Sequence, residues 1–257
     1  MSDILIQSAQ LQSTRPQIAI LDFGSQYSHL IARRVREAHV FCELYSCLVE
    51  VSVLSSNNIV GIILSGGPAS VYDAESPHVD PSVWEFIAQK NIPILGICYG
   101  MQEIAHVFGG EVSPSAEREF GRANISITEE NKELSKLLFD SVENSQMWMS
   151  HGDKVTRLPD GFVNIAHTSN SENAAIASAE KRMFGIQFHP EVTHSLQGKK
   201  VLENFVVGVC KAPTDWNMRD LAEDFIREVW TVATQSAVQQ KAMIELYPRS
   251  VAMLSRI

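Results

Sequence analysis

A cysteine stands where the local chain pattern favours a reactive thiol. Cys98 follows the apolar run 92–97 and lies at the centre of Gly-Ile-Cys-Tyr-Gly, with helix-forming residues from Gln102 onward. Gly96 and Gly100 permit a sharp strand-to-helix turn, which is typical of a nucleophile elbow. The helix N-terminus behind the sulfur favours the thiolate, which is the reactive form. The alternative is an ordinary cysteine at a plain strand-to-helix turn.

A histidine and a carboxylate two residues apart are suitable partners for this thiol. His189-Pro190-Glu191 follows the strand-like segment 183–188. An imidazole can take the thiol proton and later protonate a departing amine, while a carboxylate fixes the ring and stabilises its charged form. A lone histidine is more often structural. The pair beside an elbow cysteine predicts a triad of Cys98, His189 and Glu191, whose members need to meet only in space.

Two adjacent glycines end another apolar run, in Ser65-Gly66-Gly67-Pro68. Such glycines let backbone N–H groups approach a ligand closely. The N–H of Gly67 and that of Tyr99, the residue after the nucleophile, could together form an oxyanion hole. A plain turn is the alternative.

The elements that must position these residues follow from the hydrophobic pattern. Apolar runs predict buried strands at 17–22, 41–45, 59–64 and 92–97, and amphipathic segments predict helices at 27–37, at 83–89 and from residue 102. This alternation predicts a mostly parallel central sheet with helices on both faces. Strand-like segments separated by short turns predict an antiparallel extension from 124–128, 163–167, 174–178 and 183–188, before a returning helix at 198–209.

Composition limits the function classes. The 257 residues, 45% hydrophobic and 20% charged, suit one large globular domain or one domain with an appendage. A net charge of -9 lacks the basic footprint of a nucleic-acid binder. No apolar run approaches the length of a membrane span or signal peptide, so we expect no membrane partner and a cytoplasmic location. The four cysteines lack metal-site spacing, and we expect no metal site and reduced, buried thiols at Cys42, Cys47 and Cys210.

Taken together, three motifs resemble those of class I glutamine amidotransferases: SGGP at 65–68, GICYGMQ at 96–102 and FHPE at 188–191. The resemblance narrows to the amidotransferase domains of GMP synthetases through LDFGSQYSHLIARRVRE at 21–37, REFG at 118–121, WMSHGDKV at 148–155 and HPEVTHSLQGKKVLENF at 189–205. It extends roughly over residues 17 to 229 and implies a flavodoxin-like, three-layer fold.

The resemblance also implies a reaction. Cys98 would attack the side-chain amide of glutamine, the N–H groups of Gly67 and Tyr99 would hold the oxyanion, and His189 would protonate the departing ammonia. Water would then hydrolyse the thioester, with no cofactor. The implied glutamine contacts are Gly66, Gln102, Ser150, His151, Gly152 and Asp153. The ammonia would pass to an ATP-pyrophosphatase domain or subunit that converts XMP to GMP, and ATP and Mg²⁺ are expected only there.

The sequence departs from full synthetases after the amidotransferase segment. No SGGVDS-type loop and no Walker-type loop appears before residue 257. We therefore expect a flexible leader at 1–16, an amidotransferase domain at 17–211, a linker helix at 212–230, a tail of unknown structure at 231–257 and no synthetase domain. The chain would be a truncated form or a separate glutaminase subunit.

Rival hypotheses stay open at this point. The elbow and the HPE motif also suit amidotransferases of anthranilate, CTP or carbamoyl phosphate synthesis, and an inactive truncated fragment is a further alternative. A cysteine peptidase or γ-glutamyl hydrolase shares the elbow. The segments DFGSQY, SHGDKV and HPEVTH favour the GMP synthetase resemblance over these rivals.

Overall fold

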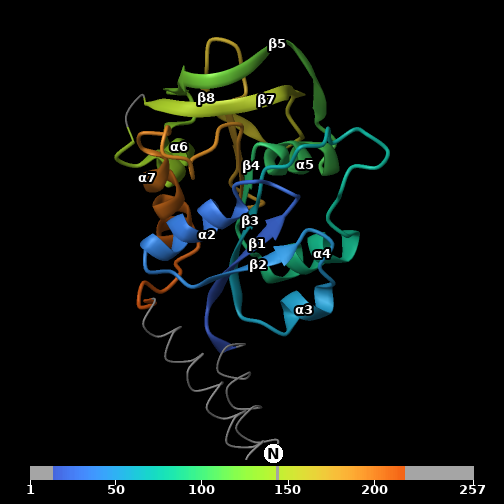
Figure 1. The fold of residues 1–257 in the computed structure, drawn as a ribbon, viewed down its shortest axis with the longest axis vertical. Coiled ribbons are helices and arrows are strands. Elements are labelled where there is room, and N and C mark those ends of the chain that lie inside the picture. Colours follow the sequence, from blue (N-terminus) through green and yellow to red (C-terminus); the bar gives the residue numbers. More distant parts are fainter. Residues whose placement is uncertain (1–13, 143–144, 218–257) are drawn as a thin grey trace, which may run out of the picture. The chain divides into compact units, whose positions relative to one another are not determined.

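The computed structural model describes residues 14–142 and 145–217, and Arg15–Trp216 forms one compact unit (Figure 1). Its main sheet has eight strands in the order β2-β1-β3-β4-β10-β9-β8-β6. The strands are β1 (Gln17–Asp22), β2 (Cys42–Ser46), β3 (Ile59–Leu64), β4 (Ile94–Ile97), β6 (Ser126–Ile127), β8 (Val163–His167), β9 (Ala175–Ser178) and β10 (Met183–Ile186). The first five strands in this order, from β2 to its fourth neighbour β10, are parallel to one another. The remaining strands β9, β8 and β6 extend the sheet with antiparallel pairing. The predicted fold class is confirmed.

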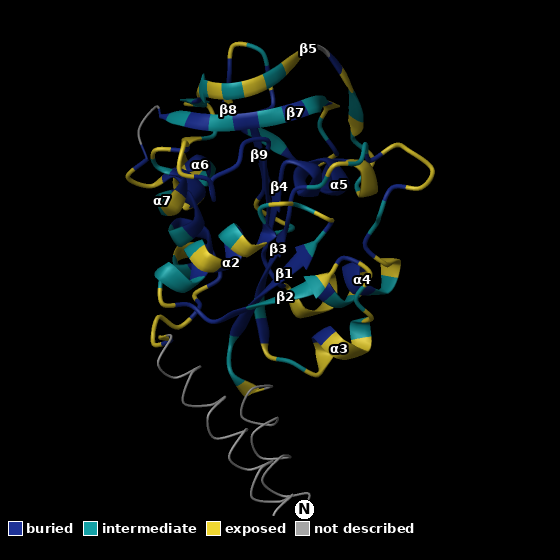
Figure 2. Ribbon diagram, in the orientation of Figure 1, coloured by how far each residue is buried: buried dark blue, intermediate teal, exposed yellow. Residues whose placement is uncertain are grey.

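Helices cover both faces of this sheet. One apolar cluster includes side chains of α2 (Ser28–Glu37), α6 (Lys132–Phe139), α7 (Gly198–Glu203) and the π-helix η1 (Asn204–Val209). The other includes side chains of α3 (Val51–Ser55), α4 (Pro81–Lys90) and α5 (Tyr99–Val107). Alternation along β1 separates the two clusters, because Ile18 and Ile20 join the first and Ala19 and Leu21 the second. Figure 2 shows the central strands as the buried layer between the helices.

Local signals set the ends of α4, the helix between β3 and β4. The Asp80 carboxylate accepts a hydrogen bond from the Ser82 N–H at 2.8 Å, and Pro81 occupies the first turn. Asn91 closes the helix at φ 52°, in the left-handed region that asparagine tolerates. The chain can therefore turn at once into β4, the strand that carries the nucleophile.

A two-stranded antiparallel sheet of β5 (Glu111–Asn124) and β7 (Gln146–Arg157) lies apart from the main sheet in hydrogen bonding and was not predicted. It includes Asn124, so only Ser126 and Ile127 of the predicted strand 124–128 join the main sheet. A backbone bridge from Trp148 to His189 brings β7 to the candidate site. The predicted helix at 198–209 is present, but its second half is a π-helix.

The end of the described chain packs against the same unit. Trp216 is buried, and its ring lies 6.4 Å from that of Phe41. Residues 212–217 contain no helix, and the remainder of the expected linker helix, the tail at 231–257 and residues 1–13 of the leader lie outside the described residues. No helix in the described ranges combines the length and apolar character of a membrane span.

The close approach of α5 to β3 generates a stability prediction. A Cβ at Gly100 would lie 2.5 Å from the Leu64 carbonyl oxygen, whereas one at Gly208 would meet nothing within 4 Å. We expect Gly100→Ala to lower the free energy of unfolding by about 1–3 kcal/mol through overpacking. The control Gly208→Ala should leave it unchanged or raise it by up to about 1 kcal/mol. Urea denaturation of both variants measures this, and equal unfolding midpoints would contradict the expectation.

Candidate active site

The turn at Cys98 has the geometry of a nucleophile elbow. Cys98 adopts φ 52° and ψ −103°, a conformation that is strained for any residue with a Cβ. Its backbone N–H donates to the Ile186 carbonyl oxygen at 2.7 Å, which ties the turn to β10. A Cβ at Gly96 would overlap the backbone of Gly100. The two glycines therefore make room for the sharp turn that presents the thiol at the carboxyl end of β4.

His189 reaches the same sheet edge from β10, the parallel neighbour of β4. Its Nδ1 lies 2.8 Å from Oε1 of Glu191, and the Cys98 side chain is close enough to raise the pKa of its ring. The His189 backbone N–H donates to the Trp148 carbonyl oxygen at 2.9 Å. The His189 and Glu191 side chains are almost completely buried. The structure thus brings the three predicted triad residues together.

These contacts set the protonation of His189. Burial lowers the pKa of the imidazole, but the neighbouring Cys98 and Glu191 side chains outweigh burial and raise that pKa well above 6.5. Because Nδ1 faces Glu191, Nε2 is the nitrogen available to the thiol. At the other three cysteines, burial raises the pKa of the Cys42 thiol to about 12 and also raises the pKa values of the Cys47 and Cys210 thiols.

The two predicted oxyanion-hole residues lie side by side. A Cβ at Gly67 would come within 3.3 Å of Cγ of Tyr99 and 3.0 Å of the Phe23 carbonyl oxygen, so the glycine loop packs directly on the start of α5. Within the described residues, neither the Gly67 N–H nor the Tyr99 N–H has a backbone hydrogen-bond acceptor. Both donors are therefore available to a ligand.

A cleft of about 560 Å³ opens beside the cysteine. It is lined by Gly67, Pro68, Ala69, Ser70, Tyr72, Cys98, Gln102, Pro114, Ser115, Arg118, Phe120, Ser150, His151, Gly152 and Asp153. Five of the six predicted glutamine contacts are among them. The sixth, Gly66, is not among the lining residues, and a Cβ there would approach Cε1 of His189 to 3.1 Å.

Asp153 connects two segments that line the cleft, strand β7 and the loop that follows β3. Its carboxylate accepts hydrogen bonds from the Ser70 hydroxyl at 2.5 Å and the Tyr72 hydroxyl at 2.9 Å. These contacts fasten β7 to the loop that follows β3. Ser70 and Tyr72 had no predicted role, because nothing in the local pattern shows that this loop faces a strand some 80 residues later.

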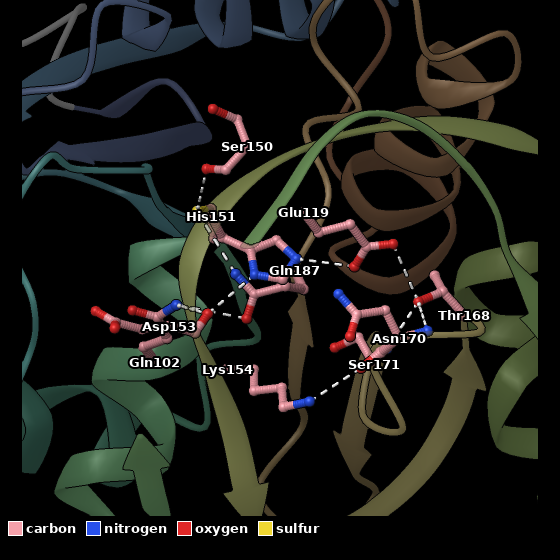
Figure 3. Close-up of polar contacts among 11 residues, drawn as sticks. Gln102, Glu119, Ser150, His151, Asp153, Lys154, Thr168, Asn170, Ser171 and Gln187 are labelled. Atoms are coloured by element: carbon pink, nitrogen blue, oxygen red, sulfur yellow. Dashed lines mark hydrogen bonds and ion pairs between the residues drawn. The ribbon is translucent and has the colours of Figure 1, made fainter. Parts of the chain in front are cut away.

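His151 bridges β5 and β7. Its Nδ1 lies 3.0 Å from the Asp153 carbonyl oxygen, and its Nε2 lies 3.2 Å from Oε2 of Glu119 (Figure 3). Burial lowers the pKa of this imidazole more than the Glu119 carboxylate raises it. His151 and His189 are therefore driven toward opposite protonation states.

Two further side chains at the site had no predicted role. Arg118 is the only cationic residue that lines the cleft, within the part of the chain that the structure describes. The side-chain amide of Gln187 lies 3.6 Å from the Cys98 sulfur. A glutamine inside the apolar segment 183–188 is a signal that sequence reasoning could have used. No group of His, Cys, Asp and Glu suited to a metal ion occurs among the described residues.

Comparisons with known proteins agree with this geometry. The family model described as "Glutamine amidotransferase class-I" matches residues 19–209. The chain is 47% identical over 212 residues to "GMP synthase [glutamine-hydrolyzing]" of Nitratiruptor sp., covering 82% of this chain and 40% of that protein. It is also 47% identical over 224 residues to the protein of that name from Schizosaccharomyces pombe, covering 86% and 41%. The chain thus spans about two fifths of the length of these relatives.

Solved structures share the fold. A candidate GMP synthase subunit from Thermoplasma acidophilum matches with a TM-score of 0.65 and 30% identity, over 77% of this chain and 94% of that one. A glutamine amidotransferase from Thermotoga maritima matches with a TM-score of 0.59 and 19% identity, over 77% and 99% of the two chains. The second likeness concerns the fold alone.

The pKa shifts generate a titration prediction. We expect the His189 ring to titrate above pH 6.5, whereas the His151 ring should titrate below pH 6.5. In Glu191→Gln the His189 pKa should fall, because a neutral amide no longer favours the charged ring. NMR titration of the ring Cε1–H signals measures both residues. A His189 pKa at or below 6.5 in the unaltered protein would contradict the geometry.

The same shift has a consequence for stability. A histidine whose pKa is raised by folding stabilises the protein fully below its unfolded pKa, near 6.5. That contribution is lost as the pH rises through the higher folded-state pKa. The free energies of unfolding of the unaltered protein and of Glu191→Gln should therefore differ less at alkaline pH than at pH 6, and denaturation curves at both pH values measure this.

Proposed function

Because this chain belongs to the class I glutamine amidotransferase family, we propose that it hydrolyses glutamine to glutamate and ammonia. The observation that carries the proposal is the meeting of Cys98, His189 and Glu191 at one sheet edge. They lie beside a cleft with two available backbone donors. This is the arrangement that an acyl transfer through a cysteine nucleophile requires.

The reaction follows from the position of each group. Glutamine binds in the cleft, the His189 ring accepts the Cys98 proton, and the sulfur attacks the carboxamide carbon. The N–H groups of Gly67 and Tyr99 stabilise the oxyanion of the tetrahedral intermediate. The imidazolium then protonates the leaving ammonia, and Glu191 stabilises the charged ring throughout. Water, deprotonated by the same imidazole, cleaves the glutamyl thioester and regenerates the thiol.

Polar groups along the cleft suit a zwitterionic amino acid. Gln102, Ser150, His151, Gly152 and Asp153 line it, and we assign them to glutamine binding, with Gly66 keeping the space beside His189 open. Asp153 supplies negative charge and Arg118 supplies positive charge within the same cleft. No cofactor is needed for the hydrolysis, since every group in the scheme belongs to the chain or to the substrate.

The fate of the ammonia is proposed from the relatives. The curated relatives named above are GMP synthases that hydrolyse glutamine, and this chain matches about two fifths of their length. We propose that the ammonia is used to aminate XMP to GMP on a separate synthetase domain or on a partner chain. ATP and Mg²⁺ would bind to that partner, and the cytoplasm would be the site of the reaction.

The triad is tested by substitution at Cys98. We expect Cys98→Ala to abolish glutamine hydrolysis, because the variant lacks the thiol that attacks the carboxamide. Glu191→Gln should leave a weak remnant, since a placed histidine base is typically worth about 10² to 10⁴ in rate. Cys47→Ala is a matched control at a buried cysteine outside the cleft. Release of glutamate is the measurement, and full activity of Cys98→Ala would refute the mechanism.

The partner is tested by reconstitution. The chain alone should form no GMP from XMP and ATP, with either glutamine or ammonium as the nitrogen source. Addition of a separately expressed synthetase domain should permit GMP formation from glutamine and raise the rate of glutamine hydrolysis. GMP formation by the chain alone, or a hydrolysis rate that does not respond to saturating partner and nucleotides, would overturn the proposed division of labour.

A further inference from the structure

The Gln187 side chain lies against the nucleophile without belonging to the predicted triad. Gln187 follows the end of β10 and precedes His189 by two residues. Its exposed fraction is 0%, and its amide Nε2 lies 3.6 Å from the Cys98 sulfur, within hydrogen-bond range for sulfur. A buried amide is stable only when its polar atoms find partners, so the contact with sulfur needs a physical account.

Neighbouring contacts fix which way this amide points. Nε2 of Gln102 donates to the Asp153 backbone carbonyl at 3.1 Å, and a carbonyl oxygen can only accept. The same nitrogen lies 3.4 Å from the Gln187 side chain, so the Gln187 atom that it meets must be the oxygen. The NH₂ group of Gln187 is thereby directed to the sulfur. Figure 3 shows this chain of contacts between Gln102, Gln187 and Asp153.

We propose that Gln187 is a catalytic residue whose amide N–H donates a hydrogen bond to the Cys98 sulfur and stabilises its thiolate form. The inference rests on the proposed function, because it concerns the same nucleophile. The thiol donates to the Ser150 carbonyl oxygen at 3.8 Å, a contact that disappears when the proton moves to His189. The Gln187 contact strengthens at that moment, since a donor paired with an anion forms a stronger hydrogen bond.

The role of Gln187 therefore differs from that of His189. The imidazole exchanges a proton with the sulfur, whereas the amide keeps both of its protons throughout. When the sulfur attacks the carboxamide its negative charge moves to the oxyanion, and when the thioester is cleaved the charge returns to sulfur. Gln187 stabilises the sulfur each time it is charged, and it assists the departure of sulfur from the thioester.

The pH dependence of Cys98 alkylation tests this contact directly. Iodoacetamide labelling of Cys98 is followed by mass spectrometry across a pH series. In Gln187→Met, which keeps the side-chain length and lacks the N–H, we expect the pH midpoint to rise by about one to two units, the effect of a hydrogen bond to a charged group. The matched control is Gln17→Met, a buried glutamine on β1 bonded to the Tyr45 hydroxyl at 3.1 Å, and its midpoint should not move.

A second variant guards against misfolding of the first. Gln187→Asn retains an amide, but the side chain is one methylene shorter and should no longer reach the sulfur, so its midpoint should rise too. Circular dichroism checks that each variant is folded. A folded Gln187 variant with the unaltered midpoint overturns the inference. Alkylation of Cys98 requires no glutamine. An unchanged midpoint therefore contradicts the role of Gln187, whereas a failure to hydrolyse glutamine contradicts the proposed function.

Discussion

The pairing of β4 with β10 is the constraint on which the candidate site depends. The register places Ile97 opposite Ile186 and Gly96 opposite Gly185, so two parallel strands end together and their next residues meet at one edge. The hydrogen bond from the Cys98 N–H to Ile186 extends this pairing into the elbow itself. A nucleophile and its base, 91 positions apart by subtraction of their numbers, are thus brought together by one strand pair.

The paired glycines Gly96 and Gly185 also explain how α5 can begin directly on the sheet surface. A Cβ at Gly96 would overlap the backbone of Gly100, and one at Gly185 would lie 2.7 Å from Cγ of Met101. The first turn of α5 therefore rests directly on both strands. This close packing holds Cys98 in a conformation that is costly for a residue with a side chain, and it aims the helix N-terminus at the sulfur. Burial then keeps the imidazole and carboxylate away from bulk water, which strengthens their interaction.

Sequence reasoning succeeded where the signal is local. The elbow, the His-Pro-Glu segment and the strands of the parallel layer each follow from a short pattern. It failed at the two-stranded β5–β7 sheet, because polar residues such as Ser150 and Asp153 hide the strand pattern and the partner strand is distant. The contacts of Asp153 with Ser70 and Tyr72, and the amide of Gln187 against the sulfur, arise only when separate elements pack together. No local pattern specifies such contacts.

The most direct measurement of the central claim is covalent trapping of the nucleophile. The protein is incubated with a glutamine analogue that carries an electrophilic carbon in place of the carboxamide, and peptide mass spectrometry locates the adduct. We expect one adduct per chain, on Cys98, and slower formation of this adduct in His189→Ala. An adduct on Cys42, Cys47 or Cys210 instead, or a rate independent of His189, would contradict it.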